Sequence, residues 1–71
     1  MHISFTNHAK WRIDERSISI LHIEQTLKNP DTTSQGFDGT ILSRKAFAGK
    51  ILEVVYTEKN KRVAVVTAYY L

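Results

Sequence analysis

The chain has 71 residues, of which 42% are hydrophobic and 24% charged, a composition close to the globular average that excludes a disordered or membrane-embedded chain. It contains no cysteine, which excludes disulfides, thiol catalysis and cysteine-based zinc sites, so an apolar core has to supply the stability. Ten Lys and Arg residues against seven Asp and Glu give a net charge of +3, which favours nucleic acid or an acidic protein as the partner.

The N-terminal residues lack the basic segment and the long apolar run of a targeting signal. No apolar run is longer than that from Val63 to Val66, whereas a membrane span needs about 20 apolar residues. We therefore expect one cytoplasmic domain over residues 1–71 that does not interact with a membrane.

The first predicted helix runs from about His8 to Arg16. Thr6 or Asn7 stands directly before it, and either side chain can cap the free backbone N–H groups of the first turn. Ala9 and Ile13 lie four residues apart and therefore share the apolar face of this helix.

A second helix is predicted from Ser19, which can act as its cap, to Asn29–Pro30, where proline prevents its continuation. The apolar residues of this segment recur at helical spacing: Ile20, Ile23 and Leu27. The two short helices are expected to form a hairpin.

The second half of the chain is predicted to form strands. Asp31 to Thr40 is the one long loop-like segment, and we expect it to be mobile around a brief edge strand. Three segments rich in Val, Ile, Tyr and Thr follow it and read as an antiparallel meander: Ile41–Ala48, Ile51–Glu58 and Arg62–Tyr70. A short strand at Ile3–Phe5 can join them. The fold class is therefore α+β, with a two-helix hairpin packed on a three- to four-stranded antiparallel sheet.

Turn residues predict the register of the meander. A two-residue loop at Lys59–Asn60 sets Tyr56 opposite Val63 and Val54 opposite Val65, on the face that the helices should cover together with Leu52. A turn at Ala48–Gly49 places Arg44 opposite Glu53 on the other face. Tyr69 has the strand parity of Val63 and Val65, so we expect it to point toward the helices, near His8 or Arg12.

His8, Arg12 and Arg16 are spaced four residues apart and would form a ridge along the first helix. Guanidinium groups grip phosphate oxygens, and a histidine titrates near neutral pH, so the ridge suits a phosphate. The alternative is structural: both arginines would pair with neighbouring acidic residues or cap carbonyl groups.

Three basic residues of the strand half, Arg44, Lys45 and Arg62, are candidates for binding the nucleic-acid backbone. The alternative is that they protect strands and turns from aggregation. His2 and His22 are far apart in the sequence and no carboxylate spacing joins them into a metal site, so none is expected.

The segment from Phe5 to Ser19 follows the pattern F-x-x-H-A-x-x-R-x-x-E-R-x-I-S. This pattern resembles the opening of a bacterial family catalogued as a domain of unknown function. Further landmarks of that family are present at Asn29–Pro30, Leu52–Tyr56 and Val65–Tyr69, so the likeness covers nearly the whole chain. Ser17 stands where the family more often has glycine.

That family looks like a branch of the RelE/ParE-type toxin superfamily. In this superfamily two helices pack on an antiparallel sheet, and many members cut RNA or are inhibited by a neighbouring antitoxin. The resemblance thus implies the same fold as the pattern of elements. It carries five residues over as motif positions: His8, Arg12, Glu15, Arg16 and Tyr69.

We therefore expect a toxin of a toxin–antitoxin pair, acting as a metal-independent endoribonuclease in which a ribose 2′-hydroxyl attacks the adjacent phosphate. Arg12 and Arg16 would hold the phosphate and its growing charge. His8 or Glu15 would take the hydroxyl proton, and Tyr69 would orient the phosphate or assist the leaving oxygen. No cofactor is expected, and the expected partners are RNA and an acidic antitoxin segment.

The alternative function is a non-catalytic binding module that occupies or poisons a protein target such as a topoisomerase, because fold alone does not choose between the two. Convergence of His8, Arg12 and Tyr69 on one accessible cleft would favour the enzyme. A buried His8 bonded only to the backbone would favour the binding module. The sequence leaves open whether the chain is a monomer or a homo-oligomer.

Overall fold

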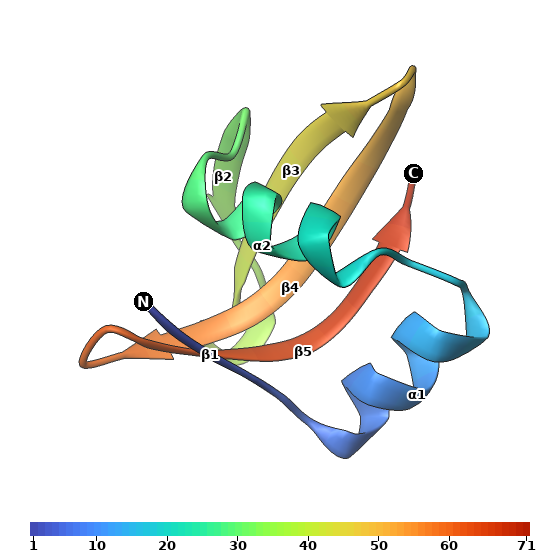
Figure 1. Ribbon diagram of the computed structural model, residues 1–71. Helices are drawn as coiled ribbons and strands as arrows, with labels where there is room; N and C mark the ends of the chain where they lie inside the picture. The colour runs from blue at the N-terminus through green and yellow to red at the C-terminus, as the bar shows by residue number, and fades with distance from the viewer.

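The computed structural model describes residues 1–71 and has the predicted α+β architecture (Figure 1). Its elements follow one another as β1 (His2–Phe5), α1 (Asn7–Glu15), α2 (Ile20–Lys28), β2 (Thr32–Gln35), the single-turn 3₁₀ helix η1 (Phe37–Gly39), β3 (Ile41–Phe47), β4 (Lys50–Lys59) and β5 (Arg62–Tyr70). The strands form one sheet in the order β1-β5-β4-β3-β2. At nine residues each, neither α1 nor α2 is long enough to cross a membrane.

The sheet corrects the predicted one in two respects: it has five strands instead of three or four, and it is mixed instead of antiparallel. The fifth strand is β2, which lies at the edge of the sheet within Asp31 to Thr40, where a brief edge strand was expected, and pairs antiparallel with β3. β1 runs parallel to β5, with His2 opposite Arg62 and Phe5 opposite Val65. A parallel pair needs a long crossover, and here the whole helical half of the chain supplies it.

Both helices begin at the predicted caps. The Thr6 hydroxyl accepts a hydrogen bond from the backbone N–H of Ala9 at 3.0 Å. The Ser19 hydroxyl accepts from the backbone N–H of His22 at 3.3 Å. Each cap satisfies one of the backbone donors that the first turn leaves free, so the start of each helix is set by its local sequence.

The link between the helices ends α1 in a Schellman motif. The N–H of Ile18 bonds to the carbonyl of Ile13, and the N–H of Ser17 bonds to that of Asp14, at 3.0 and 3.1 Å. Ser17 has a φ of 53°, in the left-handed region that favours glycine. Glycine would adopt this conformation without the strain that a Cβ brings.

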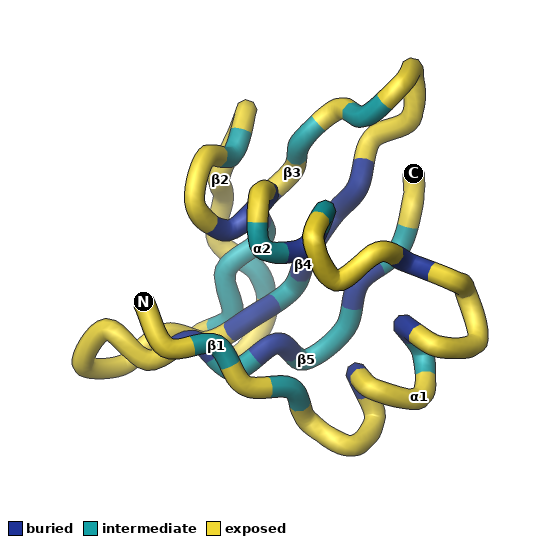
Figure 2. Tube along the Cα trace, viewed as in Figure 1, coloured by how far each residue is buried: buried dark blue, intermediate teal, exposed yellow.

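The helices pack on different strands more than on each other, so the expected hairpin is loose. α1 contacts β5 and β1, whereas α2 contacts β4 and β3 (Figure 1). Their buried residues join one core with one face of the sheet: Ala9, Ile13, Ile18, Ile23, Leu27, Leu52, Val54, Tyr56, Val63, Val65 and Ala68. The buried stretches of β4 and β5 are among the dark blue segments of the tube in Figure 2. The helices thus cover the predicted face, and the opposite face, which neither helix covers, is called the open face below.

The register of β4 and β5 differs from the predicted one. Asn60 and Lys61, with φ of 53° and 63°, form the two-residue turn, so Lys59 lies opposite Arg62. Two positive φ values are what a tight hairpin turn requires, and asparagine adopts them more easily than most residues. Tyr56 therefore lies opposite Val65 instead of Val63.

A β-bulge at Val66 changes which side chains of β5 face the core. Tyr56 pairs with Val65 but Val55 pairs with Thr67, so the extra residue falls between these two pairs. From there on the alternation along β5 is reversed. Ala68 is fully buried beneath the helices opposite Val54, and Tyr69 lies opposite Glu53 on the open face.

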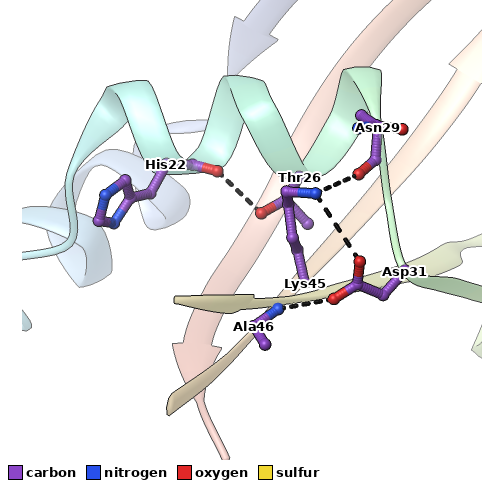
Figure 3. A network of polar contacts seen from close by, with 6 residues as sticks. All are labelled: His22, Thr26, Asn29, Asp31, Lys45 and Ala46. Carbon is purple, nitrogen blue, oxygen red and sulfur yellow. Dashed lines mark hydrogen bonds and ion pairs between the residues drawn. The ribbon is translucent and has the colours of Figure 1, made fainter. Parts of the chain in front are cut away.

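Lys45 ties the end of α2 to β3 (Figure 3). Its ammonium group donates a hydrogen bond to the Asn29 carbonyl at 2.8 Å and lies 3.7 Å from the Asp31 carboxylate. Asp31 also accepts a hydrogen bond from the backbone N–H of Ala46 at 2.9 Å. The lysine thus satisfies a carbonyl at the C-terminus of α2, where a positive charge is favourable.

Candidate functional site

Three polar side chains form a row across the open face, one from each of three neighbouring strands. Glu53 of β4 lies between Arg44 of β3 and Tyr69 of β5. The Nε of Arg44 donates a hydrogen bond to Glu53 Oε1 at 2.6 Å, and the Tyr69 hydroxyl donates to Oε2. Both carboxylate oxygens are therefore hydrogen-bonded, by one cation and one phenol.

Glu53 is only 2% exposed, although it lies on the face that the helices leave uncovered. A buried carboxylate is costly unless it is paired and hydrogen-bonded, and Arg44 and Tyr69 meet this requirement. The Arg44 side chain remains 47% exposed, and its terminal Nη groups make no hydrogen bond within the protein. Arg44 can thus hold Glu53 through Nε and still offer donors to a ligand.

The phenol of Tyr69 remains a donor at neutral pH. Its pKa is raised above 10.0, chiefly by the hydrogen bond to Glu53, then by burial and by the charge of the same carboxylate. Arg44 and Arg16 act in the opposite direction but are weaker. A phenol that is kept protonated in this way is suited to donating a hydrogen bond.

Arg16 reaches Tyr69 from the other side. Arg16 is the C-cap of α1, and its side chain extends over the part of β5 that follows the pairing with β1. There its Nη1 donates a hydrogen bond to the Ala68 carbonyl at 2.8 Å. Its guanidinium carbon lies 6.0 Å from the centre of the Tyr69 ring. Arg16, Arg44, Glu53 and Tyr69 are called the open-face site below.

His8, Arg12 and Glu15 do not join this site. Arg12 forms an ion pair with Glu15 at 3.2 Å and stacks on Trp11, with its guanidinium carbon 4.5 Å from the ring centre. His8 is exposed, and its ring lies 6.3 Å from that of Trp11. The prediction that Tyr69 would meet His8 or Arg12 is wrong, because the bulge at Val66 turns Tyr69 to the face opposite the helices.

The three predicted nucleic-acid-binding residues lie in different places. Arg44 is part of the open-face site, whereas the next residue, Lys45, points to the helix side and holds the end of α2. Arg62 begins β5 and lines a separate groove of about 670 Å³ with His2 and Lys59. These cations therefore do not form one continuous surface, and only Arg44 is next to Tyr69.

A groove of about 480 Å³ adjoins the open-face site. Its walls are η1 with the flanking Gly36 and Thr40, and its sheet side consists of Leu42, Val55 and Tyr69. Tyr69 thus belongs both to the polar row and to the groove. Neither here nor elsewhere in the structure do three His, Asp or Glu side chains come together in a way that could hold a metal ion.

Glu53 is the residue that sequence reasoning placed correctly but did not assign to the site. Its pairing with Arg44 follows from the Ala48–Gly49 turn and is confirmed. An acidic residue between Leu52 and Val54, inside an apolar stretch of a predicted strand, was the available signal, because an unpaired carboxylate would not be tolerated there.

The chain belongs to the family described as a domain of unknown function, DUF4258, whose model matches residues 5–70. No curated protein and no solved structure matches it with significance. Membership in this family assigns no activity, so the function has to be argued from the open-face site.

Proposed function

We propose that this DUF4258 domain is a toxin-like endoribonuclease that cleaves RNA without a metal, and that the open-face site is its active site. The observation that carries the proposal is the hydrogen-bonded pair of Tyr69 and Glu53, placed between two guanidinium groups on a sheet face that no helix covers. Cations for a phosphate, a carboxylate and a phenol are the groups that such a cleavage needs.

Arg44 and Arg16 would bind the scissile phosphate. Arg44 has free Nη donors, and Arg16 lies across the Tyr69 ring from it. Guanidinium groups stabilise the charge that grows on the phosphate oxygens as the attacking oxygen adds. This assigns to Arg44 the role that the sequence suggested for Arg12, which is engaged with Glu15 and Trp11.

Glu53 and Tyr69 would move the protons. The 2′-hydroxyl oxygen forms a bond to phosphorus while its proton passes to the Tyr69 oxygen, and the phenol's own proton moves along the hydrogen bond to Glu53, which is buried and is reached only through Tyr69. The bond from phosphorus to the 5′-oxygen then breaks. That oxygen takes a proton from Tyr69, which regains its own from Glu53. The products are a 2′,3′-cyclic phosphate and a 5′-hydroxyl, and both groups are restored.

An acidic antitoxin segment would restrain this activity by covering Arg16 and Arg44. The two cations lie on either side of Tyr69, so carboxylates placed on them would also exclude the RNA phosphate. Complementary charge speeds such an association and fixes its register. Co-purification of a short acidic protein encoded beside this gene would test the pairing, and growth unaffected by expression of this chain alone would contradict it.

The direct test is incubation of RNA with the purified protein in a chelator, followed by analysis of the RNA ends. Wild type should yield 2′,3′-cyclic phosphates, and Glu53→Gln and Tyr69→Phe should each reduce the rate about 100-fold or more, the usual effect of losing an acid or base. Arg12→Ala is the matched control on the exposed face of α1 and should cut normally. Intact RNA with wild type, whether the RNA is free or bound to ribosomes, would contradict the proposal.

The exposed side of α1 favours the second candidate, a protein-binding module. Trp11 is 55% exposed, and Arg12 stacks on it. An exposed tryptophan paired with arginine is typical of residues that dominate protein interfaces. If Trp11→Ala abolishes the effect of the protein on cells while Glu53→Gln does not, binding through α1 is the function and cleavage is not.

A further inference from the structure

The groove beside Tyr69 is large enough for a flat aromatic ligand and is contiguous with the proposed phosphate site. We propose that it binds the RNA base next to the scissile phosphate and that Asp38 makes it select guanine. This inference rests on the proposed function, because that function supplies the phosphate next to which the base lies.

Phe37 provides the first argument, because it is 89% exposed on a turn that is itself well closed. The N–H of Gly36 bonds to the Thr40 carbonyl at 2.9 Å, and the N–H and hydroxyl of Thr40 both bond to the Phe37 carbonyl, at 3.0 and 2.7 Å. The ring is thus presented to solvent by an ordered backbone. Such a ring is available for base stacking, which would cover it.

The position of the groove provides the second argument. Leu42 and Val55 lie opposite each other, two residues along their strands from Arg44 and Glu53. Two residues of a strand span about 7 Å. A nucleotide whose phosphate lies at Arg44 and Tyr69 can therefore extend its base over Leu42 and Val55. Its open side would then face Phe37.

Asp38 provides the specificity. It stands at the tip of η1 with a φ of 53°, lines the groove and forms neither a hydrogen bond nor an ion pair within the protein. An ionised carboxylate only accepts hydrogen bonds. Guanine is the base whose Watson–Crick edge offers two adjacent donors, N1–H and the N2 amino group. Adenine, cytosine and uracil each place an acceptor beside their donor, so the carboxylate would repel them.

The test uses nucleotide binding, which is measured independently of cleavage. Guanosine and adenosine monophosphates are titrated into the labelled full-length protein, and backbone amide shifts are followed by NMR. Guanosine monophosphate should shift the amides of residues 36–42 and of Val55 and Tyr69. It should bind about tenfold tighter than adenosine monophosphate, as one bidentate contact provides. Equal affinities, or shifts elsewhere on the protein, would overturn the inference.

Variants separate the roles of the two groove residues. Asp38→Asn keeps the shape but adds a donor, so it should remove the preference for guanine. Phe37→Ala should weaken both nucleotides, and Phe37→Leu, which keeps bulk but not the ring, should weaken them nearly as much. Asp14→Asn, an exposed acidic residue on α1, is the matched control and should bind as wild type does. A guanine preference that survives Asp38→Asn would contradict the role of Asp38.

Mapping of RNA ends separates the failure of the subsite from the failure of the function. If the RNA is cut with no preference for guanine, the proposed guanine subsite is refuted and the proposed ribonuclease activity is not. Guanosine monophosphate bound in the groove by a protein that cuts no RNA would refute the ribonuclease while the subsite stands.

Discussion

Tyr69 donates its hydroxyl hydrogen to Glu53 across the β4–β5 pair, and that carboxylate has only Arg44 as its other side-chain partner. The phenol therefore has a structural function besides the one proposed in cleavage. Loss of either partner leaves a buried carboxylate oxygen without its donor, which costs about 1–3 kcal/mol.

Tyr69→Phe should lower the free energy of unfolding at neutral pH by about 1–3 kcal/mol. It should also change how the free energy of unfolding depends on pH in the alkaline range. The pKa of Tyr69 is raised in the folded protein, so its contribution is complete below the ordinary value of 10.0 and is lost as pH rises through the raised pKa. Chemical denaturation between neutral pH and pH 11 measures both effects. Tyr70→Phe, on the same strand, is the control, and an unchanged alkaline slope in Tyr69→Phe would contradict the assignment.

Ser17→Gly should stabilise the protein by about 1 kcal/mol, because glycine adopts the left-handed conformation of this position without the strain that a Cβ brings. The φ of Ser17 is 53° at the end of α1. Thermal and urea denaturation measure the gain. Ser34→Gly, in the extended backbone of β2, serves as the opposite control and should destabilise. A loss of stability in Ser17→Gly would show that its side chain contributes more than its backbone strain costs.

Lys45→Met should destabilise the protein by about 1 kcal/mol while leaving RNA binding unchanged. The lysine bonds to the Asn29 carbonyl at the end of α2, on the side of the sheet opposite the open-face site. Methionine keeps the apolar stem but removes the donor. Urea denaturation and RNA titration measure the two effects, with the exposed Lys59→Met as control for lost charge. If Lys45→Met weakens RNA binding and Lys59→Met does not, Lys45 contacts the nucleic acid and the prediction is wrong.

Gly36→Ala should disrupt the turn that carries Phe37. A Cβ at this position would lie 2.5 Å from the Thr40 hydroxyl oxygen, closer than atoms can approach. Thr40→Ala removes that oxygen, so the double variant should lose less stability than the two single variants summed. Denaturation of all four proteins gives the coupling energy. Strict additivity would show that the contact with Leu42, at 3.2 Å, dominates instead.

The local features of this fold could be predicted from sequence, because their causes lie within a few residues. The caps at Thr6 and Ser19 and the pairing of Arg44 with Glu53 follow from hydroxyl side chains and a glycine turn. The side of the sheet to which Tyr69 points could not be predicted, because the extra residue at Val66 reverses the alternation of side chains along β5 and no residue type in the sequence indicates a bulge there. Of the open-face site, Arg16, Arg44 and Tyr69 were identified as candidate residues from the sequence, and only the carboxylate between them, Glu53, was not.

The parallel pair of β1 and β5 joins the first strand of the sheet to the last one in chain order. His2 lies opposite Arg62, and the Arg16 guanidinium bonds to the carbonyl of Ala68, which is 52 residues further along the chain. Contacts this distant in sequence form slowly, because a long loop has to close before they are made. We therefore expect Arg16 to reach Tyr69 late in folding, so that a partly folded chain has no complete open-face site.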